Sequence, residues 1–189
     1  MKYIDQEEYS GVDFSKERLA VAEYSGCTFN NCVFDELDLS NVEFVECEFV
    51  ECSLNNVLVK STAFKEVVFE RCKMMGIKFT AVNPFLLEMS FYKCQLDYSS
   101  FYQLKLKATK FSMCSLKEVD FVETNLEQSN FEGSDLTGAQ IENTDLTETD
   151  FRGAVNYRID LNQNKVGKTK FSKEGLSGLL YMHNIVIDS

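Results

Sequence analysis

The sequence predicts an all-β solenoid whose coils have four short sides and contain twenty residues each. Three observations lead to this prediction: a five-residue repeat of large apolar residues, small residues two positions before them, and cysteines that recur at intervals of twenty. The chain has 189 residues, of which 44% are hydrophobic and 26% are charged. This length and composition are sufficient for one domain with a packed core.

A large apolar residue occupies the centre of each quintet, a position that we call i. Read in fives from Val12, the chain begins VDFSK, ERLAV, AEYSG, CTFNN and continues to about residue 173, with one slip of two residues near Pro84. Of the 16 phenylalanines, only Phe85, which lies in the slip, is not at i. Residues two apart share a side of extended backbone, so we expect i and i−2 to point inward. Glycines are frequent at i+2, which indicates a turn with positive φ.

All seven cysteines occupy i−2, and their spacing sets the number of sides in a coil. Cys27 and Cys47 are twenty residues apart, as are Cys94 and Cys114, and the interval from Cys72 to Cys94 is twenty plus the slip. A four-sided coil therefore stacks five cysteines in one column and two in the next. Since no pair has the C-x₂-C spacing of zinc sites, we expect small buried thiols without a metal or a disulfide.

We expect residues 1–11 to form an N-terminal cap, residues 12–173 a solenoid of about eight coils, and residues 174–189 a short helix and strand. Ser172 is a candidate N-cap of the helix, and Asn184 would end it. The closing segment would serve either as a monomeric cap of the last coil or as a dimer interface. The predicted interface residues are Leu176, Leu179 and Leu180 on one side of the helix, and Ile185, Val186 and Ile187 in the strand.

The composition argues against several classes of function. The chain has one histidine, His183, with no nucleophile or carboxylate arranged around it, and acidic pairs such as Asp35-Glu36 have no cleft to act in. A formal charge of −11 argues against nucleic-acid binding, and no apolar run is long enough to span a membrane. The polar start of the chain and its free cysteines favour a reducing cytoplasm. We therefore expect a cytoplasmic protein without a cofactor that is not an enzyme.

The charges are banded along the sequence. Residues 19–59 contain eight acids and no base, residues 60–117 contain ten bases and four acids, and residues 118–151 contain ten acids and no base. The acids of the last band all lie at outward positions and are the candidate partner-binding residues. They are Glu118, Asp120, Glu123, Glu127, Glu132, Asp135, Glu142, Asp145, Glu148 and Asp150.

The quintets TNLEQ at 124–128, SNFEG at 129–133 and SDLTG at 134–138 resemble those of the pentapeptide-repeat family. This resemblance implies a right-handed quadrilateral parallel β-helix. The C-terminal sequence FSKEGLSGLLYMHNIVIDS resembles the closing segment of Qnr-type, gyrase-protecting members, although the chain lacks their projecting loops. That resemblance implies a head-to-head homodimer that mimics DNA, binds DNA gyrase or topoisomerase IV, and changes sensitivity to quinolones or related toxins. The alternatives are a scaffold for an unrelated protein partner, and charge that only keeps the rod soluble.

Overall fold

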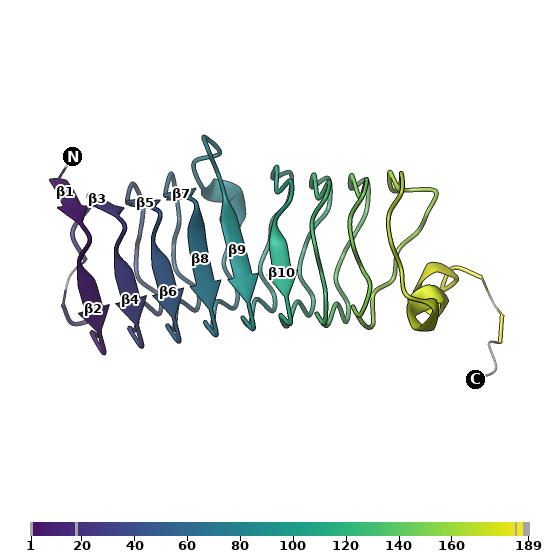
Figure 1. The fold of residues 1–189 in the computed structure, drawn as a ribbon, viewed down its shortest axis with the longest axis horizontal. Coiled ribbons are helices and arrows are strands. Elements are labelled where there is room, and N and C mark those ends of the chain that lie inside the picture. The colour runs from purple at the N-terminus through teal and green to yellow at the C-terminus, as the bar shows by residue number, and fades with distance from the viewer. Residues whose placement is uncertain (1, 18, 184, 187–189) are drawn as a thin grey trace.

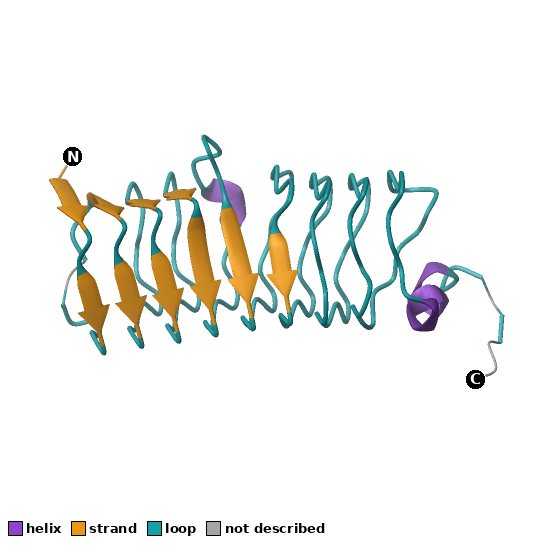
Figure 2. Cartoon of the chain, in the orientation of Figure 1, coloured by secondary structure: helices purple, strands orange, loops and turns teal. Residues whose placement is uncertain are grey.

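The structure, a computed structural model, describes residues 2–17, 19–183 and 185–186 and forms a long rod of stacked coils (Figure 1). Parallel strands line two adjacent sides of the rod (Figure 2). The first sheet contains β1 (Lys2–Asp5), β3 (Ala22–Ser25), β5 (Glu43–Val45) and β7 (Ala63–Lys65). The second contains β2 (Glu8–Ser10), β4 (Thr28–Asn30), β6 (Glu48–Val50), β8 (Val67–Glu70), β9 (Met89–Tyr92) and β10 (Lys110–Ser112).

Strand register confirms the twenty-residue coil. Tyr24 pairs with Phe44 in the first sheet, and Phe49 pairs with Phe69 in the second. Across the slip, Phe69 pairs with Phe91. Strands stack in six layers in the longer sheet, compared with about eight coils expected, and beyond β10 the stacking continues through isolated parallel bridges.

We number the four sides in chain order and keep these numbers for every coil. Side 1 carries the sheet of β1, β3, β5 and β7, and side 2 carries the six-stranded sheet. Side 3 follows with the column that begins at Phe14 and Phe34, and side 4 with the column that contains Leu39. Position i+2 forms the corner between one side and the next.

Aromatic rings at i stack in columns through the centre of the rod. The ring centroids of Phe91 and Phe111 lie 5.1 Å apart, and those of Phe111 and Phe131 lie 5.0 Å apart, with nearly parallel planes. Rings of different columns meet edge to face, as Phe101 of side 4 and Phe111 of side 2 do at 5.7 Å across the centre of the rod. Both geometries are favourable for aromatic pairs. The expectation that i faces inward is confirmed, because these side chains are almost fully buried.

Small polar side chains at i−2 have a defined role in the core. Cys72 Sγ donates a hydrogen bond to the carbonyl oxygen of Phe49 at 3.3 Å, and Thr144 Oγ1 donates to that of Phe121 at 2.7 Å. In both cases the carbonyl belongs to an i residue of the preceding coil, where an unpaired oxygen would be costly. All seven cysteines are free and buried, and burial raises the pKa of Cys47 to about 12, so this group remains a thiol.

Most corners of the coils turn through left-handed backbone. The glycines Gly133 and Gly138 have φ of 70° there, as the sequence predicts. The same conformation occurs at many non-glycine corners, including Glu46 (φ 52°) and Glu66 (φ 54°). Residues with a Cβ atom are disfavoured in this region by about 1–2 kcal/mol, so the stacked sides must hold these corners in place.

The N-terminal residues belong to the solenoid, and the prediction of a separate cap over residues 1–11 is wrong. Strand β1 pairs with β3 and β2 pairs with β4, with the same register as later coils. Lys2 and Glu7 stand at i−2 in this coil, where small residues are found elsewhere. Larger residues fit because no coil of the described chain stacks beneath them.

The slip forms a small projection on one side of the rod (Figure 1). It follows the 3₁₀ helix η1 (Phe79–Ala81), and residues 82–88 leave the regular path before β9 begins. Phe85 and Leu86 are exposed at its tip. Phe85 is thus outside the core, as its departure from position i predicts.

The chain closes with the short 3₁₀ helix η2 (Lys173–Leu179). Ser172 precedes it in extended conformation, but its side chain makes no capping hydrogen bond, contrary to expectation. Ile185 and Val186 are not in a strand, which corrects that prediction. Asn184 and Ile187 lie outside the described residues.

Candidate functional site

The ten acids of the 118–150 band do not form one face. Because each side takes only five residues, the band passes round all four sides within two coils. Side 1 receives Glu127, Asp145 and Glu148; side 2 Glu132 and Asp150; side 3 Glu118 and Asp135; and side 4 Asp120, Glu123 and Glu142. The prediction of outward positions is confirmed, since none of them is buried. These candidate partner-binding acids are therefore distributed round the rod.

Half of these acids are also neutralised by bases of neighbouring coils or residues. Lys107 Nζ lies 3.0 Å from Glu127 Oε1, and Lys165 Nζ lies 2.8 Å from Asp145 Oδ2. Each of these pairs is separated by twenty residues, so the coil period itself places a base over an acid. The remaining pairs join Lys117 to Asp135, Lys168 to Glu148, and both Arg152 and Lys170 to Asp150. The hydrogen bond from Arg152 lowers the pKa of the Asp150 carboxyl.

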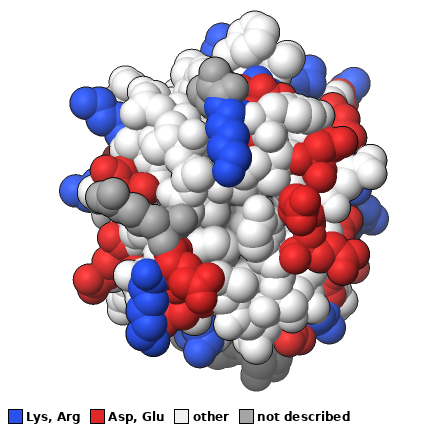
Figure 3. All heavy atoms as spheres, turned by 90° about the vertical axis from the view of Figure 1, so that its left-hand side faces the viewer, with Lys and Arg blue, Asp and Glu red and all other residues white. Residues whose placement is uncertain are grey.

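A second group of acids gathers where side 1 meets side 2 in the N-terminal half. This acidic edge consists of Glu23, Glu43, Glu46, Glu48 and Glu66. Glu23 and Glu43 are paired neighbours in β3 and β5, whereas Glu46 and Glu66 occupy the same corner in successive coils. Viewed from the N-terminal end, acidic side chains gather along the outer rim of the rod, interrupted by bases (Figure 3).

Most of the acidic edge carries uncompensated charge. Lys65 Nζ lies 2.8 Å from Glu43 Oε2, but no ion pair joins Glu23, Glu46, Glu48 or Glu66 to a base of the described chain. Glu46, Glu48 and Glu66 are exposed. Glu23, Glu43, Glu46 and Glu48 belong to the acidic band at residues 19–59, but Glu66 lies in the base-rich band at 60–117, so the bands did not predict this shared edge. The twenty-residue interval from Glu46 to Glu66 was the available signal.

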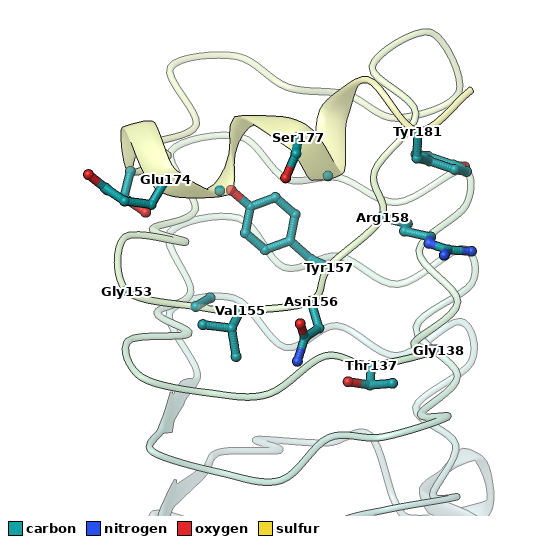
Figure 4. Close-up of a pocket in the computed structure, with 14 residues that line it drawn as sticks. Thr137, Gly138, Gly153, Val155, Asn156, Tyr157, Arg158, Glu174, Ser177 and Tyr181 are labelled. Carbon is teal, nitrogen blue, oxygen red and sulfur yellow. The ribbon is translucent and has the colours of Figure 1, made fainter. Parts of the chain in front are cut away.

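At the opposite end, η2 crosses the last coil above Tyr157 (Figure 4). Residues of η2 and of the last two coils line a groove of about 1120 Å³, and Gly175 and Gly178 of η2 pack directly on Tyr157. The Tyr157 ring is buried against Phe151 and Phe171, yet its hydroxyl has no hydrogen-bond partner among the described residues. The glycines are needed here because a larger residue would collide with Tyr157.

The predicted dimer residues are divided between two environments. Leu179 is partly buried and packs on the core, whereas Leu176 and Leu180 are exposed by 45% and 39%. Ile185 and Val186 are also exposed. The expected stripe of Leu176, Leu179 and Leu180 on one free face is therefore incomplete, because the tight 3₁₀ helix turns Leu179 toward the last coil.

Neither metal nor membrane chemistry is apparent in the part of the chain that the structure describes. Within residues 2–17, 19–183 and 185–186, no three His, Cys, Asp or Glu side chains are grouped so that they could hold a metal ion. None of these residues lies in a helix with the length and hydrophobicity that a bilayer span requires.

Comparison with known proteins agrees with this architecture. The structure is similar to that of trypsin-treated QnrB1, described as a plasmid-mediated fluoroquinolone resistance protein, with 15% identity and a TM-score of 0.65 over 98% of this chain and 100% of that one. It is also similar to HetL of the cyanobacterium Nostoc sp. strain PCC 7120, a pentapeptide repeat protein involved in heterocyst differentiation regulation. There the identity is 14% and the TM-score 0.50, over 90% of this chain and 86% of HetL.

No match was found among curated protein sequences. The family described as the pentapeptide repeat region matches residues 22–84 and 82–151, which together are more than half of the chain. The chain therefore belongs to the pentapeptide-repeat family.

Proposed function

We propose that this chain is a non-catalytic protein of the cytoplasm that binds a type II topoisomerase, DNA gyrase or topoisomerase IV, and alters its response to quinolones or related toxins. The acidic edge is the observation that carries the proposal. A topoisomerase holds DNA in a positively charged groove, and a rod with a line of unpaired carboxylates can occupy such a groove. The similarity to QnrB1, a fluoroquinolone resistance protein, over nearly the full length of both chains supports a role in the response to quinolones.

Charge density limits how strongly such mimicry can act. Duplex DNA carries one negative charge for about 1.7 Å of its axis. Successive coils are about 4.8 Å apart, so one acidic column presents roughly a third of that density. Several columns of the acidic edge must therefore act together, and the affinity should fall steeply with salt concentration.

Supercoiling by purified gyrase, titrated with this protein with and without a fluoroquinolone, tests the proposal. We expect inhibition of supercoiling, or protection from the drug, at micromolar protein. The triple variant Glu46→Lys, Glu48→Lys, Glu66→Lys should abolish the effect, because it reverses the charge of the acidic edge. The matched control Glu118→Lys, Glu132→Lys, Glu142→Lys makes the same change at acids of the 118–150 band that have no ion pair, and it should retain the effect.

The outcomes separate the alternatives. Loss of the effect in the control as well as in the edge variant would place binding in the 118–150 band or in the total charge. If the parent protein has no effect on gyrase or on topoisomerase IV, the topoisomerase proposal fails. That result would favour the alternative function, a scaffold that binds an unrelated protein partner.

We also propose that two chains associate through the C-terminal segment as a homodimer. The exposed side chains Leu176 and Leu180 support this proposal, and Leu179 serves instead to hold η2 on the core. The double variant Leu176→Asp, Leu180→Asp should give a monomer in light scattering. Leu161→Asp, at an exposed leucine before η2, should leave the dimer unchanged. A parent protein that is monomeric at micromolar concentration would contradict the proposal.

A further inference from the structure

A surface that is aromatic and basic, in contrast to the acidic edge, lies around side 3 in the middle of the rod. Tyr92 and Met113 lie in successive coils where side 2 meets side 3, Tyr98 lies at the corner between sides 3 and 4, and all three are exposed. Between residues 88 and 154 one further large apolar side chain is exposed, Tyr102 on side 4.

Coil stacking places basic residues beside these tyrosines. Lys73 forms a bridge with Gln95, and Lys78 forms one with Ser100, so the two lysines lie one coil before Tyr98 and flank its position. Lys93 is at the corner between sides 2 and 3, and its Nζ lies 4.8 Å from the centroid of the Tyr92 ring. We call Lys73, Lys78, Lys93, Tyr92, Tyr98 and Met113 the tyrosine–lysine patch.

The three lysines of this patch make no ion pairs among the described residues, and they outnumber the two acids of side 3 in the coil of Tyr98 and the next, Asp97 and Glu118. Lys73, Lys78 and Lys93 are exposed. Asp97, an acid of side 3 in the coil of Tyr98, accepts hydrogen bonds from the next coil. Its Oδ1 accepts hydrogen bonds from Ser115 Oγ at 2.6 Å and from the Lys117 amide at 2.9 Å.

Backbone geometry leaves Tyr98 accessible. It stands at a left-handed corner with φ of 63° and is exposed by 69%. The corresponding corner of the preceding coil is Gly76, whose amide donates to the Asp97 carbonyl oxygen at 3.0 Å. Because glycine has no side chain, nothing from that corner covers the Tyr98 ring.

We propose that the tyrosine–lysine patch binds an acidic segment of a protein partner. Tyrosine and methionine are enriched at the centres of protein interfaces, and unpaired lysines around them complement a negatively charged partner. A nucleic acid is the less favoured occupant, because a chain with a net charge of −11 repels an extended polyanion beyond the patch itself. This surface is opposite in charge to the acidic edge, so it engages a different partner, or a different part of one.

Fluorescence anisotropy with a labelled copolymer of glutamate and tyrosine tests this inference. The parent protein should bind the copolymer, and the variant Lys73→Gln, Lys93→Gln, Tyr98→Ser should bind it at least about tenfold more weakly. The control Lys105→Gln, Lys107→Gln removes the same number of charges from side 1, across the rod, and should bind within about twofold of the parent. A thermal melt of each variant confirms that all are folded, which the exposure of every substituted residue leads us to expect.

Three results would overturn the inference. One is the absence of copolymer binding by the parent protein at low salt. Another is an equal loss in the side 1 control, which would mean that binding follows total charge and not the patch. The third is tighter binding of a single-stranded oligo(dT) than of the copolymer, with the same dependence on Tyr98. That result would assign the patch to a nucleic acid.

Discussion

Replacing Phe111 by alanine should lower the free energy of unfolding by about 3–5 kcal/mol. The ring is fully buried and stacks between Phe91 and Phe131, and it meets Phe101 and Phe121 edge to face. Removing it leaves a cavity at the junction of two columns. Hydrogen-bonded backbone surrounds the site, so the coils have little freedom to collapse into the space.

Chemical denaturation followed by circular dichroism measures this loss. Phe85→Ala is the matched control, because it removes the same ring from an exposed position in the slip and should change stability by less than about 0.5 kcal/mol. An equal effect of the two substitutions would contradict the assignment of i to the core.

Replacing Gly178 by alanine should detach η2 from the last coil and cost about 1–3 kcal/mol. The added Cβ would collide with the carbonyl oxygen of Tyr157, which is part of the backbone and has no alternative rotamer. The hydrogen bond from the Ile159 amide to the Gly178 carbonyl oxygen, at 3.1 Å, should then be lost. Hydrogen exchange at Ile159 and across residues 173–180 reports the detachment directly.

Two further variants test whether the contact with Tyr157 causes the detachment of η2. Gly167→Ala adds the same methyl group at an unstrained position with ordinary contacts to Thr147, and it should leave exchange at Ile159 unchanged. Tyr157→Phe keeps the ring but removes the hydroxyl that has no hydrogen-bond partner, so it should not lower stability. Protection of η2 that is unaltered in the Gly178→Ala protein would show that the close approach to Tyr157 does not hold the helix.

Much of the fold can be predicted from the sequence because every coil repeats the same five-residue pattern of inward and outward positions. The phenylalanines at i and the cysteines at i−2 predict the inward positions, the coil length and the effect of the slip. The repeat even extends to EEYSG at the start of the chain, where Tyr9 stacks on Phe29. Like Glu17 in the quintet ERLAV, Glu7 is a large charged residue at i−2, which the first coil permits.

The candidate site was less predictable, since it depends on which residues meet across coils. Lys107 and Glu127 belong to different charge bands in the sequence but form an ion pair in the rod. Reading charge along the chain therefore overestimated the acidity of the 118–150 band. Aligning the sequence in steps of twenty residues would have revealed such ion pairs. The leucine spacing, by contrast, does not show that η2 is a 3₁₀ helix, because that geometry depends on how η2 packs over Tyr157.

Because the coils stack in register, each surface lies at a fixed position along the axis of the rod. The acidic edge, the tyrosine–lysine patch and η2 follow one another along a single axis, and each is fixed to a known coil. Since a coil contacts only its two neighbours, gain or loss of one whole coil would move these surfaces relative to one another by about 4.8 Å without rotating them to another side. Distances between binding surfaces in such a rod can thus be changed in evolution by duplicating or deleting twenty residues, while the chemistry of each surface is preserved.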